Sequence, residues 1–425
     1  MGIGGTRIGR STVAEVDLAA CARNFRRLRD HVGGRDVWAV VKAGAYGHGA
    51  VRVARRLALE GVAGFAVATV GEGVELRRAS IRQPLLVMAG IEPVTLGAMT
   101  AVVEHRLAVA VWDAVTAERI GAVALKSNRP PVRVHLKVDT GMGRLGVVLE
   151  RAQQVAAAVG GADGIRLDGL FSNLAAADQQ AGEGGHAHTT AQVRRFAGLC
   201  ETLRESGNLP RHRHLANSAA LLHHPGSWKA SWCTGVRPGL ALYGASLTRG
   251  RDPLVLEPVL SLRTAVAAVR DLPGGYPVGY GLRHVTSGPS RIAALPVGYH
   301  DGWPRALSDS AQVLVGDRRV PVVGAISMDL TLVDVTAIPQ VSVGDAAVLI
   351  GPWSRCPPSS GPVAGVAAAS GGAAMERMAI SVEEVAAWAH SIPHELLCRI
   401  GVRVPRRYLD GNASGIIDRG AEESA

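Results

Sequence analysis

Lysine is rare in this chain, and its positions indicate where chemistry that needs an amine could be located. Only four of the 46 lysine and arginine residues are lysines. A guanidinium stays protonated and forms neither an imine nor a carbamate, so a lysine retained in such an arginine-rich chain is a candidate for these reactions. Two of the four, Lys42 and Lys137, lie in short apolar runs of the kind that form buried strands.

Lys42 ends the run 37–42 and is followed by Ala-Gly-Ala-Tyr-Gly-His-Gly. A lysine at the end of an apolar strand is suited to covalent catalysis, because desolvation favours the neutral, nucleophilic amine. Position alone leaves a second interpretation open, in which the side chain simply reaches from the strand end into water. The choice depends on the elements that surround it.

Eight apolar, β-branched runs alternate with longer amphipathic stretches in the first 245 residues. The runs are 37–42, 64–70, 84–88, 107–112, 132–139, 167–173, 213–217 and 235–243. Repeated strand and helix units of this kind predict an α/β fold, and eight of them favour an N-terminal (β/α)8 barrel over an open doubly wound sheet. Functional groups of such barrels gather where the strands end, which is where Lys42 lies.

The pattern changes after about residue 250, where strand-like runs follow one another across short turns. They are 260–269, 291–297, 311–315, 320–326, 330–335 and 346–350, and residues 382–390 have a helical pattern. We expect a barrel at 11–250 and a C-terminal, mostly β domain at 251–408. A Pro-, Ser-, Gly- and Ala-rich stretch predicts a flexible insertion at about 354–372, and 409–425 form a polar tail.

Composition argues against several classes of protein. No run of about 18 apolar residues predicts a membrane span, and residues 1–11 do not resemble a signal peptide. The five cysteines are scattered without metal or disulfide spacing, which favours a cytoplasmic protein without a metal site. The net charge of +10 includes a basic cluster at helical spacing, with no nucleic-acid-binding motif beside it. We therefore expect neither a nucleic-acid nor a membrane partner.

Several segments, taken in order, resemble the alanine racemase family from about residue 11 to residue 408. The segment 39–49 around Lys42 resembles the family's cofactor-lysine motif. The others are 137–146, 214–218, 236–244, 278–281, 297–303, 326–329 and 403–406. The resemblance implies a pyridoxal phosphate enzyme that interconverts L- and D-alanine.

The resemblance also implies how the cofactor is bound. Lys42 would carry it covalently, and Arg237 would face its pyridine nitrogen, with His214 orienting the guanidinium. The positions that match the phosphate-binding residues are Tyr46, Ser218, Gly239 and Leu240. Decarboxylases that share this barrel place a glutamate at the pyridine nitrogen, so Arg237 favours racemisation.

Racemisation needs one base on each face of Cα, and the resemblance implies Lys42 for one face and Tyr280 for the other. Arg144 and Met328 match residues that contact the substrate carboxylate. Lys137 matches a lysine that can be carbamylated, and an ordinary strand cation is the less favoured alternative. In the family, the residues matching Tyr280 and Met328 come from the second subunit of a homodimer.

The chain departs from the family pattern at four positions. Gly44 replaces a polar residue, Asn173 a histidine beside the pyridine ring, Ser327 a cysteine and His394 a tyrosine that narrows the substrate entry. These changes leave a racemase of serine or another amino acid as an alternative to an alanine racemase. A decarboxylase and a non-catalytic pyridoxal phosphate-binding protein are further, less favoured alternatives.

Overall fold

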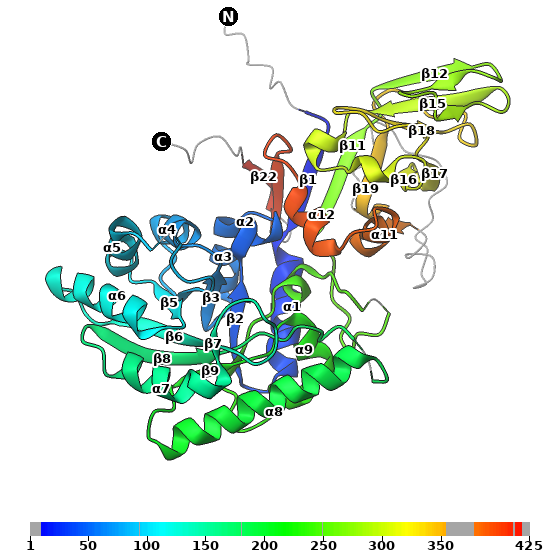
Figure 1. The fold of residues 1–425 in the computed structure, drawn as a ribbon. Coiled ribbons are helices and arrows are strands. Elements are labelled where there is room, and N and C mark those ends of the chain that lie inside the picture. Colours follow the sequence, from blue (N-terminus) through cyan, green and yellow to red (C-terminus); the bar gives the residue numbers. More distant parts are fainter. Residues whose placement is uncertain are drawn as a thin grey trace, which may run out of the picture. The chain divides into compact units, whose positions relative to one another are not determined.

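The protein divides into two compact units in a computed structural model that describes residues 10–92, 94–179, 181–248, 250–353, 378–410 and 413–418. One unit comprises Ala20–Glu257, and the other combines Met1–Ala19 with Pro258–Ala425 (Figure 1). Each unit has its own sheets and helices, and each is described separately below.

The first unit is built on a closed parallel barrel. Neighbouring strands pair in parallel from β2 to β6 and on through β8, β9 and β10, and β10 pairs back with β2. The strands are β2 (Asp36–Val40), β3 (Gly64–Val67), β4 (Leu85–Val87), β5 (Ala108–Val111), β6 (Val132–Asp139), β8 (Ile165–Phe171), β9 (His212–His214) and β10 (Gly235–Val236), with β7 (Val147–Val148) added beside β6. The predicted N-terminal barrel is confirmed.

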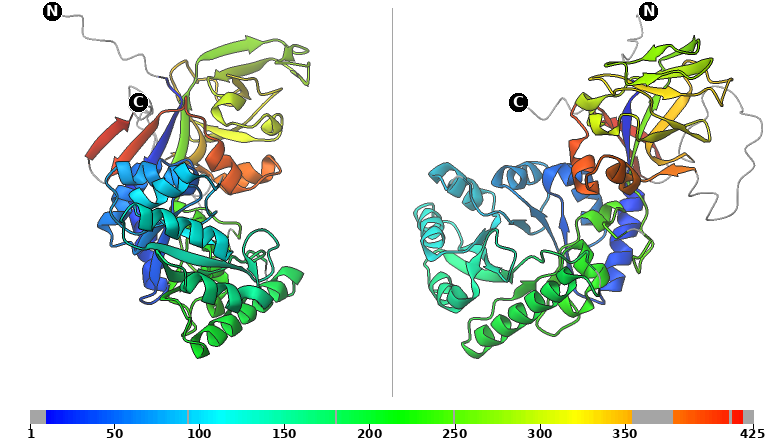
Figure 2. Two further views of the ribbon diagram at one scale, coloured as in Figure 1. Left: turned by 60° about the vertical axis from the view of Figure 1, so that its left-hand side comes forward. Right: turned by 45° about the vertical axis from the view of Figure 1, so that its right-hand side comes forward.

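Helices surround these strands and explain why some of the strands are apolar along their whole length. All residues of β3 and β5 are buried, as expected for parallel strands that are covered on both faces. The helices are α1 (Leu18–His31), α2 (Lys42–Tyr46), α3 (Ala50–Leu59), α4 (Val70–Arg78), α5 (Leu96–Glu104), α6 (Ala114–Lys126), α7 (Leu149–Gly160), α8 (Gly184–Glu205) and α9 (Ser218–His223). Figure 2 shows the long helix α8 running along the outside of the barrel.

Polar caps start several of these helices. The side chains of Thr69, Thr95, Asp113 and Asn217 each accept a hydrogen bond from a backbone N–H in the first turn of the helix that follows. Such caps satisfy N–H groups that have no partner within the helix. At α4 the cap is reciprocal, because Glu72 also reaches back to the backbone of Thr69.

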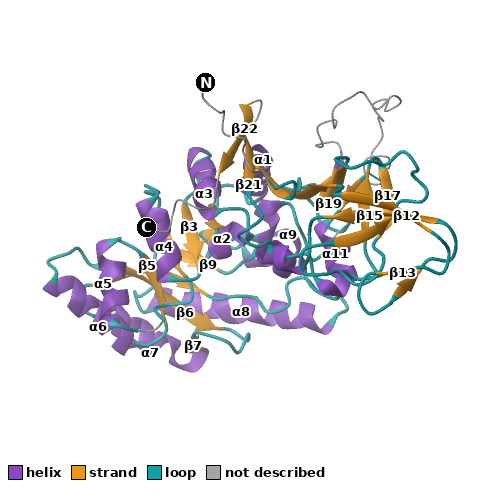
Figure 3. Cartoon of the chain, turned by 90° about the horizontal axis from the view of Figure 1, so that it is seen from above, coloured by secondary structure: helices purple, strands orange, loops and turns teal. Residues whose placement is uncertain are grey.

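The second unit is mostly β, as predicted (Figure 3). Its largest sheet has the order β17-β16-β19-β11-β1-β21-β22 with β20 beside β19, and smaller sheets are β12-β15-β18 and β13-β14. The strands are β1 (Val13–Asp17), β11 (Leu260–Ala265), β12 (Ala268–Leu272), β13 (Pro277–Val278), β14 (His284–Val285), β15 (Ser290–Leu295), β16 (Gln312–Val315), β17 (Arg318–Pro321), β18 (Thr331–Asp334), β19 (Ala346–Pro352), β20 (Ala379–Ile380), β21 (Arg406–Asp410) and β22 (Ala413–Asp418). Two helices, α11 (Val382–Trp388) and α12 (Pro393–Arg399), complete the unit.

The structure differs from the sequence prediction at both ends of the chain. β1 lies within the stretch expected to be barrel, but it pairs antiparallel with β11 and parallel with β21. Within the expected tail, β22 pairs with β21. The last predicted barrel strand is also shorter, because a 3-10 helix at Leu240–Tyr243 follows β10. The expected insertion at about 354–372 lies outside the described residues.

Among the helices that the structure describes, none combines the length and the apolar character needed to cross a membrane.

Candidate active site

Lys42 begins α2, which follows β2 and is a turn of unusual backbone geometry, not a regular right-handed helix. Ala43, Gly44, Ala45 and Tyr46 have φ values of 52°, 60°, 55° and 54°, so four consecutive residues are left-handed. Left-handed conformation costs roughly 1–2 kcal/mol for each L-residue that has a Cβ, and only Gly44 escapes this cost. Such strain persists only where the surrounding structure enforces it, and it is concentrated at functional sites.

Two buried aromatic side chains, Tyr243 and His48, contact this turn and the strand before it. The Tyr243 hydroxyl donates to the carbonyl oxygen of Val40 at 2.9 Å, at the end of β2. The His48 ring is buried and stacks on the Tyr243 ring with a centroid distance of 4.4 Å. His48 Nδ1 lies 2.9 Å from the carbonyl oxygens of both Ala45 and Tyr46. The turn is therefore fixed to the barrel on both sides of Lys42.

The residues predicted to bind phosphate converge beside this turn. Ser218 Oγ accepts hydrogen bonds from the backbone N–H of Gly239 at 2.8 Å and of Ala241 at 3.2 Å. A Cβ atom on Gly239 would lie 2.3 Å from the Tyr46 hydroxyl, so only glycine allows this approach. Leu240 follows Gly239 directly and begins the 3-10 helix. Three loops thus bring a phenol, a hydroxyl and backbone amides together.

Arg237 is buried, with 4% of its surface exposed, and all its acceptors are neutral. Its guanidinium donates to His214 Nδ1 at 2.5 Å and to the carbonyl oxygens of His214, Ser172 and Leu215 at 2.7, 2.6 and 3.2 Å. Burial lowers the pKa of Arg237 to about 10, so the group remains charged at neutral pH. The predicted pairing of His214 with Arg237 is present.

His135 extends this chain of contacts and was not predicted from the sequence. Its Nδ1 lies 3.0 Å from His214 Nε2, and both rings are buried. Burial, followed by nearby cationic groups, lowers the pKa of His135 to about 3 and that of His214 well below its usual value. Because Arg237 can only donate, His214 accepts at Nδ1 and donates from Nε2 to His135. One signal was available, since His135 and Lys137 share a face of β6.

Lys137 is a buried lysine close to other cationic side chains of the barrel. Its side chain is 6% exposed, and Nζ lies 3.4 Å from the carbonyl oxygen of Met88. Burial, followed by the charges of Arg144, Arg237 and Lys42, lowers its pKa to about 8. Three cationic side chains therefore act on Lys137 at this end of the barrel.

Asp139 shapes the loop that carries Arg144. Its carboxylate accepts hydrogen bonds from the backbone N–H groups of Gly141, Met142 and Gly143 at 2.8, 2.7 and 2.8 Å. Burial raises the pKa of Asp139, but these backbone hydrogen bonds and one from Arg144 together bring it below its usual value. The Asp139 carboxylate therefore bonds to the backbone of this loop. The Arg144 side chain is exposed.

The positions that depart from the family pattern have identifiable surroundings. Gly44 is left-handed at φ +60°, and a Cβ there would have nothing within 4 Å. Asn173 Nδ2 lies 3.3 Å from Met142 Sδ, beyond the end of β8. Ser327 Oγ donates to the carbonyl oxygen of Leu330 at 3.0 Å, and His394 lies on α12; both belong to the second unit.

Tyr280 and Met328 also belong to the second unit, and both side chains are exposed. Tyr280 is 73% exposed in the turn between β13 and β14, and its backbone forms a β-bridge with Ala325. Met328 is 50% exposed. Leu282, Val285 and Leu330, with exposures of 68%, 52% and 43%, add further exposed apolar surface in these segments.

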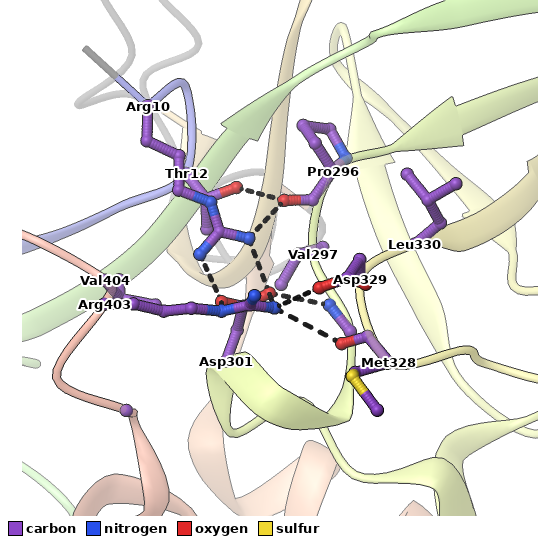
Figure 4. Close-up of polar contacts among 12 residues, drawn as sticks. Arg10, Thr12, Pro296, Val297, Asp301, Met328, Asp329, Leu330, Arg403 and Val404 are labelled. Carbon is purple, nitrogen blue, oxygen red and sulfur yellow. Dashed lines mark hydrogen bonds and ion pairs between the residues drawn. The ribbon is translucent and has the colours of Figure 1, made fainter. Parts of the chain in front are cut away.

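A buried carboxylate fixes the segment that carries Met328 (Figure 4). Asp301 is fully buried and forms ion pairs with Arg10 and Arg403, the latter at 2.6 Å. Arg403 also bonds to Asp329 at 2.7 Å and to the Met328 carbonyl oxygen at 3.4 Å. Two arginines far apart in the sequence thus meet one carboxylate beside Met328.

The pKa of Asp301 predicts an acid-dependent contribution to stability. Burial raises this pKa, but the hydrogen bonds from Arg10, Arg403 and the Gly298 amide lower it below its usual value. A depressed pKa means that the contribution is present above about pH 4, the unfolded value, and is lost as pH falls through the folded value. We expect Asp301→Asn to lower the free energy of unfolding at pH 7 by about 2–3 kcal/mol, because a buried charge network loses one partner.

Urea denaturation at pH 7 and at pH 3 measures this effect. The wild type should lose stability on acidification, and Asp301→Asn should lose less. Asp271→Asn is the control, because Asp271 pairs with Arg291 but its side chain is 75% exposed, so we expect a change within about 0.5 kcal/mol. A wild-type unfolding free energy for Asp301→Asn at both pH values would contradict the role of this carboxylate.

A closed barrel carrying a lysine among buried and exposed cations, in one chain with a mostly β unit, defines a two-domain barrel enzyme. Residues 16–247 match the family model "Alanine racemase, N-terminal domain", and residues 259–376 match "Alanine racemase, C-terminal domain". The alanine racemase of Sorangium cellulosum is 39% identical over 402 residues, which cover 94% of this chain and 99% of that protein. The chain belongs to the alanine racemase family.

Solved structures agree with this assignment. The alanine racemase of Clostridium difficile 630 superposes with a TM-score of 0.84 at 29% identity, covering 98% of this chain and all of that one. The alanine racemase of Bartonella henselae, solved with covalently bound pyridoxal phosphate, has a TM-score of 0.77 at 27% identity. It covers 94% of this chain and all of its own.

Proposed function

We propose that this enzyme interconverts L- and D-alanine with pyridoxal phosphate bound covalently to Lys42. The observation that carries the proposal is that Lys137 and Arg237 are both buried in the barrel, and that the charges of Arg144, Arg237 and Lys42 act on Lys137. A phosphorylated cofactor and an amino-acid substrate bring the anionic groups that such a site needs. The Bartonella henselae relative with the bound cofactor supports the same choice.

The loops around Gly239 fit the cofactor phosphate. The backbone amides of Gly239 and Ala241 both donate to the Ser218 hydroxyl and so lie on one side of these loops. The Tyr46 hydroxyl approaches Gly239 so closely that a Cβ would fill the space. We propose that Tyr46, Ser218, Gly239 and Leu240 hold the phosphate, since backbone amides and hydroxyls beside late barrel strands commonly do so.

Arg237 favours racemisation over the other reactions of this cofactor. Bound pyridoxal phosphate supplies an electron-withdrawing ring that acidifies the substrate Cα–H bond. A guanidinium does not release its proton at neutral pH, so Arg237 would keep the ring nitrogen unprotonated and limit electron withdrawal. The neutral His214 and His135 fix the orientation of Arg237. Limited withdrawal favours rapid return of the proton to Cα.

Lys42 and Tyr280 are the two bases in this proposal. One removes the proton from one face of Cα, and the other delivers a proton to the opposite face, so no net proton is gained or lost. Positioned acid–base groups of this kind contribute about 10²–10⁴-fold to a rate. Arg144 and the backbone of Met328 would hold the substrate carboxylate, which keeps Cα between the two bases.

We propose a homodimer in which Tyr280 and Met328 of the partner subunit complete the barrel site. Contiguous exposed apolar patches mark interaction surfaces, and the bridge from Tyr280 to Ala325 brings the segments of Tyr280 and Met328 together. Tyr280, Leu282, Val285 and Met328 are each at least half exposed. The buried ion pairs of Asp301 give the Met328 segment the rigidity that such a surface requires.

Lys137 has the properties needed for a carbamate. With a pKa of about 8, part of the population is the neutral amine near neutral pH, and only this form reacts with carbon dioxide. The product is an anion. It would replace the repulsion between Lys137 and Arg144 by attraction and so orient Arg144 toward the substrate.

The test of the cofactor lysine uses Lys42→Arg. Arginine keeps the charge but cannot bond covalently to the cofactor, so we expect complete loss of attachment and of racemisation. Borohydride reduction of the enzyme followed by peptide mapping locates the attached cofactor. Wild-type protein should carry it on the peptide that contains Lys42, and Lys229→Arg is the control that should retain it. Attachment retained in Lys42→Arg would refute the assignment.

One observation favours a second candidate, a racemase of the same mechanism that acts on serine. Gly44 stands beside Lys42 with open space around it, where the family has a polar side chain. Initial rates of D/L interconversion for alanine and serine separate the two candidates. We expect a higher kcat/KM for alanine, and a higher value for serine would overturn the alanine assignment. Carbon dioxide release, or cofactor binding without turnover, would instead indicate a decarboxylase or a binding protein.

A further inference from the structure

A single carboxylate anchors the left-handed turn that follows Lys42. Glu72 Oε1 accepts a hydrogen bond of 2.6 Å from the backbone N–H of Ala43, the first left-handed residue of the turn. The two residues are 29 positions apart in the sequence. Hydrogen bonds to an ionised acceptor are shorter and stronger than neutral ones, so this contact suits a backbone held in a disfavoured conformation.

The second oxygen of Glu72 has a different task. Oε2 accepts from the backbone N–H of Ala68 at 2.7 Å and of Thr69 at 3.1 Å, while the Glu72 N–H donates to Thr69 Oγ1 at 3.3 Å. These bonds are the reciprocal cap at the start of α4. The cap uses only Oε2, so the bond from Oε1 to Ala43 is additional to what the helix needs.

The two oxygens connect neighbouring strand ends of the barrel. Lys42 follows β2, Ala68 follows β3, and these strands pair in parallel, with Val40 opposite Ala66. Glu72 therefore bridges the turn that carries Lys42 to the adjoining strand and helix. Besides this bridge, the left-handed residues are held by the contacts of His48 and by backbone hydrogen bonds such as that from the Ala45 N–H to the Val41 carbonyl oxygen at 2.9 Å.

We propose that Glu72 is a positioning residue for Lys42. Its bond to Ala43 fixes where the left-handed turn begins and so fixes the direction in which the Lys42 side chain leaves the backbone. The proposal rests on the proposed function of Lys42 as the cofactor lysine and base. Glu72 acts through the backbone of Ala43 and takes no part in proton transfer.

Two substitutions separate the anchor from the cap. Glutamine serves a capping box as well as glutamate does, so Glu72→Gln can keep the Ala68 and Thr69 bonds with its one oxygen. Its amide NH2 then faces the Ala43 N–H, and the anchor is lost. Thr69→Ala does the reverse, because it removes the side-chain acceptor of the cap and leaves both Glu72 oxygens in place.

Amide hydrogen exchange of the peptide spanning residues 41–47 is the first readout, measured without pyridoxal phosphate. The free energy of a hydrogen bond to a charged group corresponds to a change of about ten- to a hundredfold in the equilibrium for local opening. We therefore expect the exchange rate in Glu72→Gln to rise by that factor. Cofactor retention on dialysis and kcat should fall, with little change in the KM for alanine and a melting temperature near that of the wild type. Thr69→Ala should show a lower melting temperature with wild-type exchange, cofactor retention and kcat.

Several outcomes would overturn the proposal. Wild-type exchange in Glu72→Gln would show that the anchor does not hold the turn, and faster exchange with an unchanged kcat would show that the turn does not position Lys42. Glu72→Ala removes both the anchor and the cap, so it should show faster exchange, lower cofactor retention and kcat, and a lower melting temperature. If only the melting temperature fell, Glu72 would act only as a helix cap. Because exchange is measured without cofactor, it tests the anchor whether or not Lys42 carries the cofactor. The Lys42→Arg experiment tests the cofactor assignment separately.

Discussion

The accumulation of positive charge within the barrel is the constraint on which the site depends. Burial, followed by the charges of Arg144, Arg237 and Lys42, lowers the pKa of Lys137 to about 8. The protein tolerates Arg237 by surrounding its guanidinium with carbonyl oxygens and a neutral imidazole. An anionic cofactor or substrate, as proposed, would relieve the remaining repulsion, so an arrangement that is costly for folding would favour its binding.

The preference for arginine over lysine has a visible structural reason. Arg77 donates to the carbonyl oxygens of Ile81, Gln83 and His105, and Arg406 binds three further carbonyl oxygens near the chain end. A planar guanidinium with five donors can join several backbone segments, which a lysine ammonium does less well. Lysine is then left for positions such as Lys42 and Lys137, where amine chemistry is proposed.

Local patterns predicted the barrel, the family resemblance supplied most of the candidate site residues, and non-local contacts explain what was missed. Each barrel strand has its own apolar run, so periodicity sufficed for the barrel, and Lys42, Ser218 and Arg237 lie shortly after strand ends. β1 resembles the start of a barrel unit, but its partner β11 lies about 250 residues later, which no local pattern reveals. The left-handed turn has only Gly44 as a signal, and its anchor Glu72 lies in another helix.

The two proposed bases belong to different units of the chain. Lys42 lies in the barrel unit and Tyr280 is exposed on the other unit, and the proposed mechanism takes Tyr280 from a partner subunit. Mixing two inactive variants, Lys42→Ala and Tyr280→Phe, under conditions that allow subunit exchange tests this directly. Racemisation should return in part, because one site of each mixed dimer recovers both residues. An inactive mixture despite demonstrated exchange would contradict a two-base site shared between subunits.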